Sequence, residues 1–133
     1  MNLDRLSTWA PQALALLRIV AGLLFLEHGT AKLSGFPSSP NPGPTFMTLL
    51  WFQGVIELIG GPLLTLGLLA RPVAFVLAGD MAVAYFMAHF PKSVFPIQNG
   101  GDAAILYCFT FFYLFFAGPG CWSLDAKSMT RGK

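Results

Sequence analysis

Four long apolar stretches dominate this chain of 133 residues, and they restrict it to one kind of fold. They run over residues 13–33, 45–70, 72–89 and 101–117. Each is at or near the roughly 20 residues that an α-helix needs to cross a bilayer. A closed barrel would need alternating strands of about ten residues, and the sequence shows no such alternation. We therefore expect a single all-α domain over residues 1–133, an integral membrane four-helix bundle with antiparallel up-down topology.

The composition agrees with a membrane environment and excludes one class of partner. Hydrophobic residues make up 55% of the chain and charged residues only 11%, whereas about 25% of residues are charged in soluble domains. A chain of this size has no core large enough to bury so much apolar surface, so the lipid bilayer must solvate the rest. The net charge is +2 and the sequence has no basic run that would follow a phosphate backbone, so we expect no nucleic-acid partner.

The connections between the stretches predict the orientation in the membrane. Residues 34–44 hold four prolines and predict a long loop, residues 69–72 a tight turn, and residues 91–100 a second loop. Four spans place both termini on the side of the tight turn. That side carries five basic residues (Arg5, Arg71, Lys127, Arg131 and Lys133), against two (Lys32 and Lys92) on the side of the loops. Because basic residues favour the cytoplasmic side, we expect both termini in the cytoplasm.

Ionisable side chains at membrane depth are the candidates for function. Of the six acidic residues, four lie inside or at the edge of apolar stretches: Glu27, Glu57, Asp80 and Asp102. A charge at the bilayer centre costs at least about 2.5–3.5 kcal/mol on insertion scales, so it survives where it has a partner or a function. Together with Arg18, His28 and Lys32, these acids form the candidate polar site. No metal site is expected, since two histidines are too few and no ligand spacing is convincing.

Helical spacing predicts which groups point into the bundle. In the first span, one line within about 40° carries Arg18, Gly22, Phe25, Gly29 and Lys32. In the second span, a glycine-lined polar stripe runs through Gln53, Gly54, Glu57, Gly60 and Gly61. Small residues let membrane helices approach closely, so these lines should face other helices. We expect Arg18, Glu57 and Asp80 to point inward, although the same stripe also suits tight packing alone.

The partners of these charges stay open at this stage. Glu57 and Asp80 are expected at similar depth, where two nearby carboxylates do not both ionise, so one should be protonated or paired with a cation. Arg18 has three alternatives: an inner carboxylate, backbone carbonyls, or the headgroups. At the end of the bundle away from the cytoplasm, His28 is expected to form a pair with Glu27 or Asp102.

Several short motifs, taken in order, resemble the DoxX family over about residues 13–125. They are Arg18 with Gly22, His28-Gly29 followed by Lys32-Leu33, Glu57 before Gly60-Gly61, Gly67 before Arg71, Asp102, and Gly118-Pro119-Gly120 followed by Ser123-Leu124-Asp125. Asp102 stands where the family commonly has Glu, which shortens the reach of that carboxylate. The resemblance implies a four-helix protein of the bacterial inner (plasma) membrane.

The resemblance also implies a redox setting. The family name traces to a small subunit of a thiosulfate:quinone oxidoreductase, and relatives are described as membrane oxidoreductase or redox-stress components. It therefore implies redox-protein partner subunits. Since the sequence shows no haem, flavin or iron–sulfur signature, a bound quinone or a partner subunit would have to carry the electrons. The site would lie between the helices and use Arg18, Glu27, His28, Glu57 and Asp102, with Asp80 and Lys32 in support.

Three functions remain open from the sequence. A quinone-associated redox subunit, which need not itself be catalytic, requires an amphipathic pocket beside protonatable groups. A structural or assembly protein without catalysis requires polar groups that are fully paired. A carrier of a small solute or of protons would use Glu57, Asp80 and Pro62. Small four-helix membrane proteins often assemble, so the aromatic fourth span is either a homo-oligomer contact or a lipid face.

The orientation is testable with fusions. A reporter enzyme that is active only in the periplasm should be inactive when it is fused after Lys133, because the side rich in basic residues stays in the cytoplasm. The same reporter inserted in the loop of residues 91–100 should be active. Activity of the C-terminal fusion would show the opposite orientation.

Overall fold

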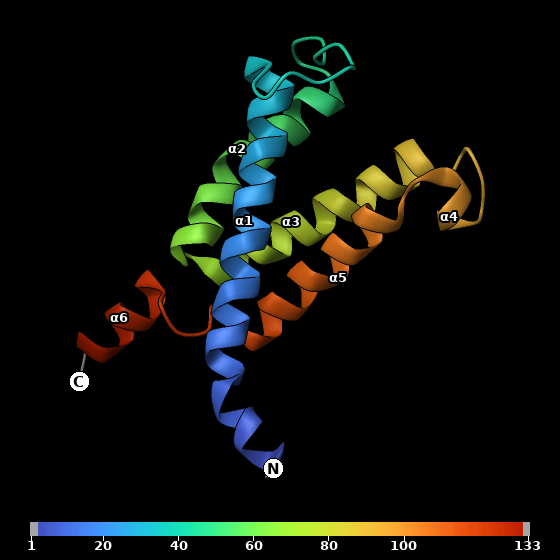
Figure 1. Ribbon diagram of the computed structural model, residues 1–133. Coiled ribbons are helices and arrows are strands. Elements are labelled where there is room, and N and C mark those ends of the chain that lie inside the picture. The colour runs from blue at the N-terminus through green and yellow to red at the C-terminus, as the bar shows by residue number, and fades with distance from the viewer. Residues whose placement is uncertain (1–2, 132–133) are drawn as a thin grey trace.

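The computed structural model describes residues 3–131, and the four expected spans form an all-α bundle (Figure 1). The long helices are α1 (Ala10–Ser34), α2 (Leu49–Leu66), α3 (Ala70–Ala84) and α5 (Asp102–Ala117). A 3-10 helix (η1, Leu3–Trp9) precedes α1, and a π-helical turn (η2, Tyr85–His89) continues α3. The short helices are α4 (Pro96–Asn99) and α6 (Leu124–Arg131). The expected fold class is thereby confirmed.

The long helices alternate in direction and form two antiparallel pairs. Helix α1 packs along α2, α3 packs along α5, and a smaller contact between α2 and α3 joins the pairs. Both termini and the turn after α2 lie at one end, called here the terminal end (Figure 1). The loops of residues 35–48 and 90–101 lie at the opposite loop end, where the two pairs diverge.

Length and composition agree with membrane insertion. Within residues 3–131, three helical segments are long and apolar enough to cross a bilayer: Leu3–Ser34, Leu49–Leu66 and Ala70–His89. The helix Asp102–Ala117 is also apolar but shorter. Many large apolar side chains on these helices are exposed on the outside of the bundle, as expected where lipid takes the place of water.

The second span is shorter than the sequence indicated. We expected residues 45–70, but α2 begins at Leu49 and ends at Leu66. Thr48 starts the helix by accepting a hydrogen bond from the Trp51 amide (3.4 Å). Gly67, at φ 66°, ends it in the left-handed conformation, and its amide donates to the Leu64 carbonyl (3.0 Å). The apolar run therefore continues into both neighbouring turns, and α1 is the longest helix instead.

The other three spans differ from the expected bounds by a few residues. Helix α1 covers residues 10–34 rather than 13–33, and α5 covers residues 102–117 rather than 101–117. The third span begins at Ala70 rather than at residue 72 and reaches residue 89 through η2. Its earlier start follows from Asp125, whose carboxylate accepts hydrogen bonds from the Leu69 and Ala70 amides (2.9 and 2.8 Å). This cap comes from a residue far along the chain, which no local pattern predicts.

Backbone contact between glycines holds α1 against α2. A Cβ atom added at Gly61 would lie 2.6 Å from the Leu26 nitrogen and 2.8 Å from the Gly22 oxygen. A Cβ added at Gly29 would lie 2.5 Å from the Leu58 nitrogen. The predicted inward lines of both helices are therefore confirmed, because their glycines allow the two backbones to touch.

Aromatic rings connect the two helix pairs. Phe25 of α1 is buried and meets Phe111 and Tyr107 of α5 edge to face, with ring centroids 4.6 and 4.9 Å apart. These rings continue a core of small and aliphatic side chains from α2 and α3, including Leu64 and Leu77. The aromatic fourth span thus faces the core with some of its rings and the outside with others.

The glycine contact predicts a difference between two alanine substitutions. Gly61→Ala should lower the free energy of unfolding by about 1–3 kcal/mol, because the added methyl meets backbone atoms that cannot move aside. Gly79→Ala is the matched control, since a Cβ there meets nothing within 4 Å. It should leave the stability equal or slightly higher, because alanine favours the helix. Unfolding of both variants in detergent micelles measures the difference, and equal stability of the two would contradict the close contact.

Candidate functional site

Arg18 is fully buried at the terminal end and is surrounded by carbonyl groups. Its Nη1 donates to the Leu64 and Thr65 carbonyls (both 2.6 Å), and its Nε donates to Pro119 (2.7 Å). Its Nη2 reaches Trp122 (2.9 Å) and Cys121 (3.4 Å). The last carbonyls of a helix have no partner within it, and they favour a positive charge. Arg18 therefore adopts the carbonyl alternative rather than the carboxylate one.

The same end is held by two further charged side chains. Asp125 caps the start of α3, as described above, and its amide donates to the Gly67 carbonyl (3.0 Å). Arg71 Nη1 donates to the carbonyls of Phe115 and Phe116 at the end of α5 (2.8 and 2.6 Å). We call Arg18, Gly67, Arg71 and residues 118–125 the terminal clasp. Since its polar groups bond to main-chain groups of helix ends and of residues 119–122, these motif residues stabilise the fold.

A second set of charges lies nearer the loop end, between α1 and α2. Lys32 Nζ donates to Glu57 Oε1 at 2.7 Å, with the lysine side chain 30% and the glutamate side chain 2% exposed. The close backbone approach of α1 and α2 brings these two residues together, one from each helix. The second oxygen, Glu57 Oε2, is buried and has no hydrogen-bond partner among residues 3–131.

Asp80 of α3 joins this pair from the third helix. Gln53 lies one turn before Glu57 on α2, and its Nε2 donates to the main-chain carbonyl of Asp80 (3.5 Å). Asp80 is 7% exposed and interacts electrostatically with both Glu57 and Lys32. Its Oδ2 is buried without a partner in the described part of the chain. We call Lys32, Gln53, Glu57 and Asp80 the polar cluster.

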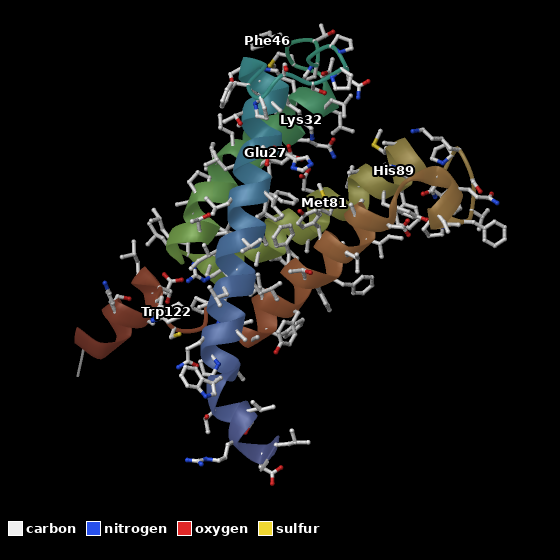
Figure 2. The ribbon with its side chains drawn as sticks, in the orientation of Figure 1. Glu27, Lys32, Phe46, Met81, His89 and Trp122 are labelled. Carbon is white, nitrogen blue, oxygen red and sulfur yellow. The ribbon has the colours of Figure 1, made fainter. Side chains whose placement is uncertain are left out.

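A cavity of about 290 Å³ adjoins the polar cluster beneath the first loop. It is lined by His28, Ala31, Lys32, Ser39, Asn41, Pro42, Gly43, Pro44 and Leu50. Lys32 thus both lines the cavity and pairs with the buried Glu57. Figure 2 shows Lys32 high on α1, below the loop that carries Phe46.

The remaining predicted site residues lie outside the cluster. Glu27 is exposed and interacts electrostatically with Tyr107 of α5, and Asp102 is exposed at the first residue of α5. An acid at that position is favoured by the free amides of a helix start. Within residues 3–131, no hydrogen bond or ion pair joins His28 to either acid. The expected pairing of His28 with Glu27 or Asp102 is therefore not formed in this structure, and the His28 ring lies instead beside Tyr107 of α5, with ring centroids 6.5 Å apart.

The histidines contact carbonyls near the loop end. His28 Nδ1–H donates to the Leu24 carbonyl (2.7 Å) of its own helix, which leaves Nε2 for another partner beside the cavity. His89 donates from Nδ1 to the Asn99 carbonyl (3.0 Å). Figure 2 places His89 at the loop end of the second pair, well away from Glu27 and Lys32.

The structure confirms that Arg18, Glu57 and Asp80 point into the bundle, but it separates the arginine from the two acids. It gathers Lys32, Glu57 and Asp80, and it adds Gln53, which was not among the candidates. Its position four residues before Glu57 on the polar stripe was the available signal. Chemically, the cluster offers one donor beside a cavity and two unpartnered carboxylate oxygens, an arrangement that can hold and pass protons.

The ion pair predicts that a second substitution restores the stability that a first one removes. Lys32→Met should lower the free energy of unfolding by about 3 kcal/mol, because it leaves the buried Glu57 without its partner. The double variant Lys32→Met/Glu57→Gln should recover most of this loss, since no uncompensated charge remains. Thermal unfolding of the single and double variants in micelles measures the coupling. If the two losses simply add, the pair is not coupled as the 2.7 Å contact indicates.

Comparison with known proteins places the chain among bacterial membrane proteins. An uncharacterised protein of Haemophilus influenzae is 43% identical over 130 residues, covering 94% of this chain and 97% of that protein. An uncharacterised membrane protein of Mycobacterium tuberculosis is 29% identical over 144 residues, covering 91% of this chain and 84% of that protein. No solved structure matches the chain. The DoxX family model matches residues 13–90, which include Arg18 and the whole polar cluster, and the chain therefore belongs to the DoxX family of membrane proteins.

Proposed function

We propose that the protein is a quinone-associated subunit of a membrane oxidoreductase in the bacterial inner membrane, with both termini in the cytoplasm. The observation that carries the proposal is the position of Lys32, which lines the cavity of about 290 Å³ and pairs with the buried Glu57. A protonatable group deep in the bundle is thereby connected to a space at its edge.

The residues present suit a quinone headgroup. The oxidised ring carries carbonyl oxygens that need donors, and the reduced ring carries hydroxyls that need acceptors. Lys32, whose Nζ is a donor, lines the cavity, and Glu57 Oε2 is a buried acceptor without a partner among the described residues. The cavity has about the volume at which small-ligand pockets begin, roughly 300 Å³, so it suits the ring, and the isoprenoid tail would extend into lipid.

The cluster has defined tasks in this proposal. A bound quinone supplies two-electron, two-proton chemistry, with the electrons delivered by a partner redox subunit. Lys32, which lines the cavity, would hold the headgroup by donating a hydrogen bond to it. Glu57 gives or takes a proton through Oε2, while Lys32 limits the cost of its buried charge. The loop of residues 35–48 covers the cavity and restricts the entry of water.

The alternatives explain fewer of the observations. A purely structural role accounts for the terminal clasp, where the charged side chains bond to main-chain groups. It does not account for two buried, unpartnered carboxylate oxygens in the polar cluster. A carrier needs access from both sides, and the clasp closes the terminal end.

Four aromatic side chains of α5 are exposed: Phe109, Phe112, Tyr113 and Phe116. This face suits lipid, a redox partner subunit or a second copy of the chain.

Electron transfer in membranes tests the proposal. Membranes that contain wild type or Glu57→Gln at equal protein level are assayed for reduction of a short-chain quinone. The variant should be at least about a hundredfold slower, the lower range for the loss of a general acid–base group. Glu27→Gln is the matched control, since it removes the other glutamate of the chain, which is exposed and does not line the cavity. Equal rates for Glu57→Gln and wild type would contradict the redox role.

A further inference from the structure

The polar cluster contains more acidic than basic side chains. Lys32 is one cation, and Glu57 and Asp80 are two acids, so full ionisation would leave one negative charge in the interior. Arg18 does not compensate for it, because carbonyl groups at the terminal end occupy its guanidinium. A net charge buried at membrane depth is costly, and neighbouring carboxylates do not both ionise. One further positive charge is therefore needed.

The two acids lie near enough for their charges to interact. Gln53 and Glu57 lie one turn apart on α2, a rise of about 6 Å, and Gln53 contacts the main chain of Asp80. Glu57 is 1% and Asp80 7% exposed, and each has a buried oxygen without a partner in residues 3–131. Two unpartnered carboxylate oxygens on facing helices are the arrangement expected where a small cation binds.

Groups on the other packed elements do not supply the charge. Within the described chain, the charged side chains that act on Asp80 are Glu57 of α2 and Lys32 of α1. On α5, Asp102 is exposed at the first residue, and the Tyr107 ring packs on Phe25.

We infer that the Glu57–Asp80 pair is a binding site for one exchangeable proton, carried by Asp80 while Lys32 keeps Glu57 ionised. Transfer of the proton from Asp80 to Glu57 Oε2 breaks one O–H bond and forms another, so the charge of the cluster does not change. Glu57 does not line the cavity itself, so the last step, to an acceptor in the cavity, runs through its partner Lys32, which does. This inference deepens the proposed function, on which only the last step rests, because it names the group that stores the proton.

Infrared spectroscopy of the purified protein in lipid tests the site directly. A protonated carboxyl has a carbonyl stretching band that a carboxylate lacks. At neutral pH, the wild type should show this band, Asp80→Asn should lose it, and the control Glu27→Gln should retain it. An alkali ion would occupy the same oxygens, so the spectra are recorded in sodium chloride and in choline chloride. A band that appears only in choline would overturn the proton assignment in favour of sodium.

A conservative variant covers the case in which Asp80→Asn does not fold. Asp80→Glu keeps the carboxyl and should shift the band in frequency rather than remove it. A wild-type spectrum without the band in either salt would overturn the inference, as would a band that stays unshifted in Asp80→Glu. The measurement needs no quinone, so its failure is distinguishable from failure of the electron-transfer assay.

Discussion

The guanidinium of Arg18 is the interaction on which the closed end of this bundle depends. A fully buried cation is costly, and here five carbonyl oxygens, together with the electrostatic effect of Asp125, compensate for it. Two of them belong to the end of α2, and three belong to residues 119–122. The arginine therefore attaches the segment after α5 to the first helix pair. That segment in turn places Asp125 at the start of α3.

The clasp determines what the rest of the molecule can do. It fixes the helix ends at the terminal end, while the glycine contacts fix α1 against α2. The second pair is joined to the first mainly near α2 and α3, so the pairs diverge towards the loop end (Figure 1). The polar cluster lies where α1, α2 and α3 still meet, beside a cavity at the loop end. Rigidity at one end and access at the other thus follow from the same packing.

The sequence predicted the features that depend on one helix at a time. Glycine spacing gave the inward faces of α1 and α2, and hydropathy gave the four spans and the burial of Glu57 and Asp80. The partners depend on the relative heights of two helices, and the start of the second span was placed four residues early, at 45 instead of 49. An error of that size is about 6 Å along the axis, enough to hide the pairing of Lys32 with Glu57. The exposure of Glu27 and Asp102 depends on how the pairs diverge, which hydropathy does not encode.

The buried polar residues of the bundle form two groups with different chemistry. The charged side chains of the clasp form hydrogen bonds with main-chain groups. Part of the clasp, residues 118–125, lies beyond the range of residues 13–90 that the family model matches. The polar cluster lies wholly within that range, and it retains two buried oxygens without partners. A structural network has no reason to leave carboxylates incompletely bonded at membrane depth, because an apolar pair would pack there at lower cost. The cluster therefore has the properties of a site for a mobile ligand, and a proton is the smallest ligand that satisfies its charge.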